Sequence, residues 1–447
     1  MASLFIRVIN KRQVLALAFG AMVGWSWVAL TGVWIENAGA VGAMLAFVMG
    51  GGALIFVGLT YAELAAAMPL VGGEHVYSRR ALGTTASFVC TWALLLGYVS
   101  VVAFEAVALP TVVEYLWPGF SRGYLWTVAG WEVNATWLLT GVAAAVAMIA
   151  VNVLGIRAAA RLQVLVIVVV VASGLALITG AAANGSLANV SPAFAGGLAG
   201  ISSVLVMVPF MFVGFDVIPQ SAEEIDLPFG DIGRLLLLSI VLAIVWYVLV
   251  IGAVSLGLSG TARSAASLPT AEAAATLLGG TWAGKLLVIG GIAGILTSWN
   301  AFLIGGSRAL YALARAGQVP ATFASLHPKF RTPHHAILLT GGLAVIAPFF
   351  GRPAMIWLVD AGGLGIVTAY AMVAWSFLVL RAREPLMERP YRVKHGRLVG
   401  CLALMFSLAL AALYLPWSPA ALIWPQEWLI ILSWGALGLI FYRRPGN

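Results

Sequence analysis

Charged residues are scarce in this chain: they make up 9% of its 447 residues, whereas hydrophobic residues make up 62% and the mean hydropathy is +1.02. Soluble domains carry about 25% charged residues, so a chain of this composition cannot cover itself with polar surface. Lipid must therefore be its solvent. Cysteine is also rare, and the two present, Cys90 and Cys401, lie in apolar runs where a thiol packs as a small hydrophobe. This excludes a disulfide framework.

Motifs for nucleotide hydrolysis and for metal catalysis are missing as well. No glycine-rich phosphate loop occurs in the chain, which excludes ATP hydrolysis by it. His327, His334 and His335 fall in one short segment, but they lack the spacing and the neighbouring carboxylates of a metal site. We therefore predict that the protein is not an enzyme and that it uses no cofactor.

Long apolar runs recur from one end of the chain to the other. Each is long enough, at about 20 residues, to cross a hydrocarbon core of roughly 30 Å as a helix, and too long for a membrane β-strand of about ten residues. We predict an all-α membrane protein with about twelve transmembrane helices, at residues 13–35, 40–67, 87–112, 135–155, 160–181, 198–221, 234–258, 282–313, 335–351, 355–380, 398–415 and 424–442.

Lys and Arg residues indicate the orientation, because cytoplasmic loops carry an excess of them. With the N-terminus inside, only Arg122, Arg263, Lys285 and Arg352 of the 24 Lys and Arg residues fall on the outer side, which leaves 20 on the inner side. We predict a multi-pass protein of the cell (cytoplasmic) membrane with both termini cytoplasmic. The net charge of +8 is explained by contacts with lipid headgroups and not nucleic acid, since the cations sit at helix ends and form no single patch.

Two of the predicted spans are interrupted halfway. In the first, the run GAMVGWSW at 20–27 places two glycines beside a serine; in the sixth, FVGFD at 212–216 is followed by Pro219. Glycine weakens a helix and proline removes a hydrogen bond, so both spans can unwind there. Breaks at matching places, five spans apart, are typical of membrane proteins with two inverted repeats and a solute site at the midplane. The alternative is that the glycines only let helices pack closely.

Three ordered stretches of the chain form specific sequence signatures. They are YAEL at 61–64 with MP at 68–69 and GGEHVY at 72–77, FVGFD at 212–216 with AEE at 222–224, and SR at 307–308 with YALAR at 311–315 and HPKFRTP at 327–333. These stretches resemble the second helix, the sixth helix, and the eighth helix with its following loop, in the amino acid, polyamine and organocation transporter family. The resemblance is greatest to its cationic-amino-acid-transporter branch.

The resemblance implies a fold of two inverted five-helix repeats, at 13–181 and 198–380, plus two added helices at 398–442, all in one transmembrane domain at 1–447. It also implies that the first and sixth helices are unwound at the midplane, that the substrate binds between the first, third, sixth, eighth and tenth helices, and that transport follows alternating access. In relatives that carry amino acids, the carboxylate lies against the first-helix turn and the ammonium meets carbonyl groups of the sixth helix.

The first-helix turn departs from the family pattern. Where many relatives have Gly-Ser-Gly, this chain has Gly24, Trp25 and Ser26, followed by Trp27. A bulky indole would reshape the turn that receives a carboxylate, which favours an organic amine over an ordinary α-amino acid. Tryptophan faces also attract organic cations, by about 0.5–2 kcal/mol. The alternative is that both indoles pack against neighbouring helices.

Two carboxylates inside predicted spans are candidate sites for a substrate cation or a proton, because an ionisable group within a bilayer is costly. Asp216 lies at the sixth-helix break, where it could attract an ammonium group or cap the following half-helix. Glu105 lies in an apolar part of the third span and could face the cavity or reach water at the outer end. Gating or structural ion pairs are predicted for the inner-side acids Glu63, Glu223 and Glu224, the last two with Arg234.

The coupling ion in this interpretation is Na⁺ or H⁺, and exchange and uniport stay open. In the related two-sodium fold, hydroxyl groups of the eighth helix face the first-helix break, and Thr297 and Ser298 could supply them. The alternative is that these hydroxyls bond back to their own helix. Proton-coupled relatives often carry a fifth-helix lysine, and the matching position here is near Val170. Proton coupling through such a lysine is therefore not expected.

These observations together predict a secondary active transporter for a small organic amine, polyamine or amino acid. The predicted substrate-binding residues are Gly24, Trp25, Ser26, Trp27, Glu105, Phe212, Gly214, Phe215 and Asp216. One alternative is a membrane nutrient sensor that binds a solute without transporting it. Another is a permease or exchanger for neutral or cationic amino acids.

Overall fold

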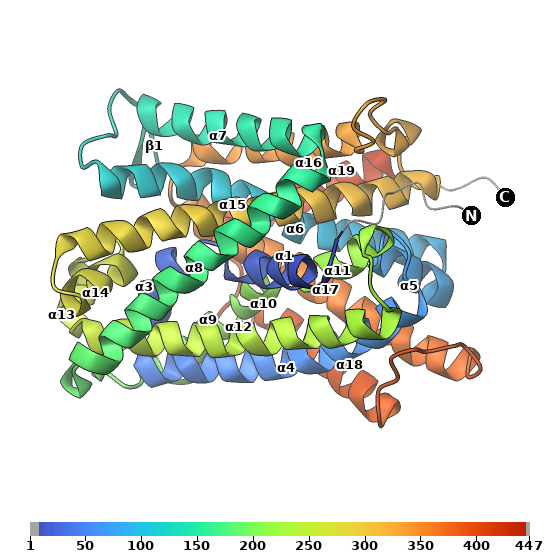
Figure 1. Cartoon of the computed structure of the whole chain (residues 1–447), viewed down its shortest axis with the longest axis horizontal. Coiled ribbons are helices and arrows are strands. Elements are labelled where there is room, and N and C mark those ends of the chain that lie inside the picture. Colours follow the sequence, from blue (N-terminus) through green and yellow to red (C-terminus); the bar gives the residue numbers. More distant parts are fainter. Residues whose placement is uncertain (1–8, 444–447) are drawn as a thin grey trace.

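Long apolar helices packed side by side make up almost all of the structure (Figure 1). The computed structural model describes residues 9–443, apart from the side chains of residues 156–165. Four cations of the predicted inner set, Arg7 and Arg444 and the side chains of Arg157 and Arg161, lie outside this described part.

The first span is built from three consecutive helices, α1 (Lys11–Val23), α2 (Ser26–Ala29) and α3 (Thr31–Ala38). Asn10 begins α1 with a capping box, because its side chain accepts from the Gln13 amide and the Gln13 side chain accepts from the Asn10 amide. Helical structure stops at Gly24 and Trp25, and the segments Lys11–Ala29 and Thr31–Ala38 are bent by 66° from one another. The chain thus changes direction inside an apolar span.

The remaining apolar segments form the body of the bundle. They are α4 (Ala40–Ala67), α6 (Thr84–Leu116), α7 (Ala135–Leu154), α8 (Ile156–Asn184), the series α9 (Gly197–Leu205), α10 (Val208–Phe212) and α11 (Val217–Gln220), and α12 (Phe229–Gly257), α15 (Thr281–Arg315), α16 (His334–Ala344), α17 (Ala354–Arg383), α18 (Gly396–Leu413) and α19 (Gln426–Phe441).

Membrane-spanning length is met by nine apolar helical segments in the described part of the chain, or ten if the bent first span is counted. Two shorter apolar helical segments, His334–Phe350 and Gln426–Phe441, overlap the predicted spans 335–351 and 424–442; the first consists of α16 and a following 3₁₀ helix. The prediction of an all-α, multi-pass membrane protein is confirmed. The count of twelve crossings and the division into repeats at 13–181 and 198–380 stay predictions.

Short elements lie between the long helices, and the apolar runs of the sequence do not predict them. They are the helices α5 (Glu74–Leu82), α13 (Gly260–Ala265) and α14 (Pro269–Leu277), the 3₁₀ helices Leu187–Val190, Ala222–Glu224, Ala321–Ala324 and Ala347–Phe350, and the strands β1 (Tyr124–Val128) and β2 (Trp131–Asn134). The two strands pair antiparallel, with Val128 opposite Trp131. Ala129 and Gly130 both have positive φ in the connecting turn, as two-residue hairpin turns require.

Helix α6 is the centre of the bundle. It is the most deeply buried of the long apolar helices that the structure describes, and it packs against α15 and α17. Helices at the periphery instead expose large apolar side chains, such as Leu139 of α7, Leu408 of α18 and Leu439 of α19. Exposed leucines on the outer helices fit a surface that faces lipid. A polar solute site is therefore expected near the buried middle of α6 and not on the outer helices.

Ion pairs join helix ends on the side predicted to be cytoplasmic. Glu224 pairs with Arg308 at 3.1 Å, and both side chains are buried. For Glu224 the predicted partner Arg234 is wrong, because Arg234 pairs with Asp231, one helical turn away on α12, at 3.3 Å. The prediction chose a cation that is close to Glu224 in sequence. The sequence alone does not show that Arg308 of α15 lies closer in space.

Candidate functional site

The break between α1 and α2 lies directly against α15. A Cβ atom on Gly294 would overlap the carbonyl oxygen of Gly24. A Cβ atom on Gly24 would lie 2.7 Å from Ser298 Oγ and 3.0 Å from Glu105 Oε1. Glycine is therefore required on both sides of this contact, which brings the opened backbone of the first span to a serine and a carboxylate.

Glu105 reaches this break from the middle of α6. Its side chain is buried and accepts a hydrogen bond from Ser298 Oγ, and it lies beside the backbone amide of Trp25. Its second oxygen, Oε2, has no hydrogen-bond partner among the described residues. The structure thus places this carboxylate at the first-helix break, away from the outer end of its helix.

A small cavity of about 20 Å³, lined by buried residues, lies at this point. Its lining includes Gly24, Trp25, Ser26, Glu105 and Ser298, and its apolar walls include Phe210 and Phe302. Such a volume holds about one water molecule and is too small for an amino acid. The structure therefore shows the site in a closed form, which a solute could enter only after helices separate.

Tyr247 of α12 connects the two broken spans, and sequence reasoning missed it. Its hydroxyl lies 3.0 Å from Ser26 Oγ, 2.5 Å from the Met22 carbonyl oxygen and 3.3 Å from that of Met211. A single tyrosine in an apolar run carries no sequence signal for such a role. The contact joins the end of α1 to the end of α10.

Tyr247→Phe is expected to lower solute uptake about tenfold. The substitution removes the hydroxyl group that lies beside the Met22 and Met211 carbonyl oxygens at the ends of α1 and α10. Leaving a buried polar group without its partner costs about 1–3 kcal/mol. Initial uptake rates in proteoliposomes would measure this. Tyr442→Phe is the control, because the Tyr442 hydroxyl bonds Thr85 at the exposed end of the bundle. Equal rates in the wild type and Tyr247→Phe would show that the bridge is dispensable.

The sixth span is opened at 213–216, between α10 and α11. Gly214 has φ +135°, and a Cβ atom there would lie 2.7 Å from Ala21 Cβ, so the sixth-span break touches the last turn of α1. Asp216 Oδ1 accepts a hydrogen bond of 2.8 Å from the Gly214 amide, while Oδ2 has no partner among the described residues. Asp216 Oδ1 thus stabilises the turn at 213–216, and Oδ2 can accept a hydrogen bond from another group.

The aromatic residues at the two breaks pack mainly against other rings. Phe215 lies 5.3 Å from Tyr61 and 5.4 Å from Tyr370 between ring centroids. Phe212 lies beside Tyr247, and Trp27 lies 5.3 Å from Trp246. None of these three predicted binding residues lines the small cavity, and neither do Gly214 and Asp216. Their role in substrate binding stays a prediction.

Both candidate sodium ligands lie within hydrogen-bonding distance of the Gly294 carbonyl oxygen of their own helix, but their other partners differ. Thr297 Oγ1 lies 3.1 Å from the Gly20 carbonyl oxygen of α1 and 2.8 Å from that of Gly294 on its own helix. Ser298 Oγ donates to Glu105. Thr297 therefore lies where a cation between α1 and α15 would need a ligand, and Ser298 serves the carboxylate. The sodium site itself stays a prediction.

A second buried carboxylate lies near the sixth-span break and was also missed. Glu74, at the start of α5, accepts a hydrogen bond from Gln220 Nε2 of α11. Burial raises the pKa of Glu74 well above its usual value, and the nearby Asp216 carboxyl group adds to this rise. The GGEHVY stretch thus contacts α11, directly after the break in the sixth span, through the hydrogen bond between Gln220 and Glu74.

Comparison with known proteins finds similarity over almost the whole chain. Residues 9–440 match the amino acid permease family. The branched-chain amino acid permease BcaP of Bacillus subtilis is 27% identical, over 98% of this chain and 92% of that protein. The methylthioribose transporter of the same organism is 25% identical over the same shares. Cationic amino acid transporter 4 of Mus musculus is 27% identical, over 85% of this chain and 60% of that protein.

Proposed function

This chain belongs to the amino acid permease family, and we propose that it is a secondary transporter whose central site binds a small solute through a protonated amine. Membership of a family of permeases makes the protein a multi-pass membrane transporter and not an enzyme. The amine preference and the location of the site are the proposal. So are placement in the cell membrane and the cytoplasmic position of both termini.

Glu105 is the observation that carries the proposal. A buried carboxylate occupies the first-helix break, beside the Trp25 amide that would otherwise be offered to a substrate carboxylate. Two like charges about 4 Å apart repel by roughly 4 kcal/mol at an effective dielectric constant near 20. An ionised Glu105 therefore opposes a carboxylate in this position and attracts an ammonium group with similar strength.

Opening of the closed cavity would provide alternating access. On one side of the cavity, Thr270 Oγ1 of α14 donates to the Trp27 carbonyl oxygen at 3.1 Å. On the other side, the buried Glu224 and Arg308 pair joins the segment after α11 to α15. Separation of one contact while the other holds would expose the site to one side of the membrane at a time.

A second candidate is a permease for neutral amino acids, which the 27% identity to a branched-chain amino acid permease favours. In that case Glu105 would take up a proton whenever a substrate carboxylate binds at the break, and transport would be coupled to H⁺. Coupling to Na⁺ would instead use Thr297 and the Gly20 carbonyl oxygen. The two ions are separated by measuring uptake with either gradient alone.

Amines without a carboxylate are expected to stabilise the detergent-solubilised protein against heat, because a ligand of the native state adds about 2.7 kcal/mol at 100 times its dissociation constant. The measurement is the unfolding temperature with a panel of amines, polyamines and amino acids, each with and without sodium. Uptake of each stabilising compound into proteoliposomes distinguishes a carrier from a sensor. A response to α-amino acids alone would reject the amine proposal in favour of the second candidate.

A further inference from the structure

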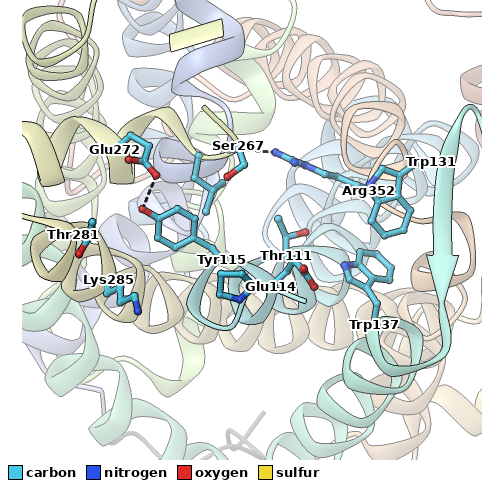
Figure 2. Close-up of a pocket in the computed structure, with 12 residues that line it drawn as sticks. Thr111, Glu114, Tyr115, Trp131, Trp137, Ser267, Glu272, Thr281, Lys285 and Arg352 are labelled. Atoms are coloured by element: carbon cyan, nitrogen blue, oxygen red, sulfur yellow. Dashed lines mark hydrogen bonds between the residues drawn. The ribbon is translucent and has the colours of Figure 1, made fainter. Parts of the chain in front are cut away.

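Two adjoining cavities lie at the end of the bundle that is predicted to face outward. The larger, of about 520 Å³, lies among the ends of α6 and α7, the β-hairpin, α14 and α15 (Figure 2). The other, of about 460 Å³, lies beside α3 and α13. Ser267 and Arg352 line both. Three of the four cations predicted on the outer side, Arg263, Lys285 and Arg352, are wall residues of these cavities.

Arg352 has unused hydrogen-bonding capacity. Its side chain has five N–H donors and stays charged, yet its one described hydrogen bond runs from Nη2 to the Ser267 carbonyl oxygen, at 3.0 Å. It forms no ion pair with any side chain that the structure describes. Burial lowers the pKa of the Arg352 guanidinium, so the charge is partly removed from water without a counter-ion. An anionic ligand would supply one.

Arg263, unlike Arg352, uses most of its hydrogen-bonding capacity within the protein. Its guanidinium donates to three backbone carbonyl oxygens, those of Leu258, Asn189 and Ser191. These bonds tie the segment around residue 190 to the end of α12, which gives Arg263 a structural role. Arg352 makes no comparable set of contacts within the described structure, and that difference singles it out as the residue available to a ligand.

The two acidic side chains that line the larger cavity, Glu114 and Glu272, both accept hydrogen bonds from the protein. Glu114 accepts hydrogen bonds from the Gly119 amide and from the amide and hydroxyl of Ser121. Glu272 Oε1 accepts one from Tyr115 at 3.1 Å. Figure 2 shows the second cation, Lys285, across the cavity from Arg352, with Trp131 and Trp137 on the arginine's side. Lys285 is exposed, so the cavity is open to the surface.

The larger cavity lies above the central site along two shared helices. Thr111 lines the cavity six residues after Glu105 on α6, which is about 9 Å along the helix axis. Lys285 lines it 13 residues before Ser298 on α15, which is about 20 Å. Thr270, which bonds the Trp27 carbonyl, follows the cavity residue Leu268 closely on α14. A solute leaving the cavity would meet the α14 contact and then the first-helix break.

We propose that the outer cavity is a capture site for the carboxylate group of amino-acid-like substrates, with Arg352 as its anchor. The aromatic rings of Trp131 and Trp137, 4.7 Å apart, offer an apolar wall to the rest of the solute. This inference rests on the proposed transport function and deepens it: the cavity recognises the carboxylate first, and Glu105 recognises the ammonium group afterwards. Solutes without a carboxylate bypass the first step.

The test compares leucine with 3-methylbutylamine, which is leucine without its carboxylate. Arg352→Gln is expected to raise the KM for leucine uptake into proteoliposomes about tenfold and to leave the KM for 3-methylbutylamine within twofold. Arg352→Lys should restore part of the leucine affinity, because it keeps the charge and loses the planar fork. Arg122→Gln is the control, since Arg122 is an exposed cation of the same end that lines neither cavity.

Equal KM changes for both compounds, or none for either, would overturn the capture site. If the wild-type protein transports no compound of the panel of amines, polyamines and amino acids, the proposed function fails, and the capture site is judged by heat stability instead. Stabilisation by leucine that survives Glu105→Gln and disappears in Arg352→Gln supports the site under that outcome. Stabilisation that is absent, or unchanged by Arg352→Gln, rejects it.

Discussion

Glu105→Gln is expected to reduce uptake of an amine substrate about 100-fold, which corresponds to the roughly 2–3 kcal/mol of a lost charge-assisted contact. Glutamine keeps the size of the side chain and can still accept a hydrogen bond from Ser298 Oγ, so the closed cavity is retained. The change removes the negative charge and replaces one acceptor oxygen with an N–H donor group. Initial uptake rates over a range of substrate concentrations, in proteoliposomes of matched protein content, would measure the loss.

The matched control for Glu105→Gln is Glu388→Gln, which removes a carboxylate from an exposed loop position far from the cavity lining. That variant should transport at the wild-type rate. Heat stability of Glu105→Gln should equal or exceed that of the wild type, because a buried carboxyl group with one unpartnered oxygen is itself destabilising. Uptake within threefold of the wild type would place the amine site elsewhere in the protein.

Helix positions could be predicted from the sequence because they follow from apolar length alone. The predicted span 40–67 coincides with α4 (Ala40–Ala67), and the predicted span 135–155 differs from α7 by one residue. Larger differences occur where helices continue beyond the apolar run, as α6 does to Leu116 and α12 does at its start, Phe229. The β-hairpin was missed because two strands of four and five residues leave little periodicity to detect.

The candidate site could be predicted only in part, because contacts between distant segments have no trace in one sequence. Glu105 was singled out as a carboxylate in an apolar run, but its partner Ser298 is 193 residues away. Tyr247 and Ser26 are 221 residues apart, and neither belongs to a recognisable motif with the other. A charge in an apolar run is conspicuous, whereas a hydroxyl group that joins two helix breaks looks like any other packed tyrosine.

Glu63→Gln is expected to destabilise the folded protein by about 3–5 kcal/mol, the effect of removing one partner from a buried ion pair. The fully buried Glu63 carboxylate binds two arginines, Arg381 at 2.5 Å and Arg389 at 2.9 Å, and accepts a hydrogen bond from the Val393 amide. Neutralisation would leave both guanidinium groups largely buried without a counter-ion. The midpoint of unfolding in a denaturant titration of the detergent-solubilised protein would measure the change.

Glu384→Gln separates this effect from a general loss of charge on the same side of the protein. Glu384 also binds an arginine through two hydrogen bonds, to Arg80, but both side chains are partly exposed, and exposed pairs contribute only about 0–1 kcal/mol. Stability should therefore fall severalfold more in Glu63→Gln than in Glu384→Gln. Equal losses would mean that the arginines find water or lipid phosphate once Glu63 is neutral, and that the second-span signature is kept for gating and not for stability.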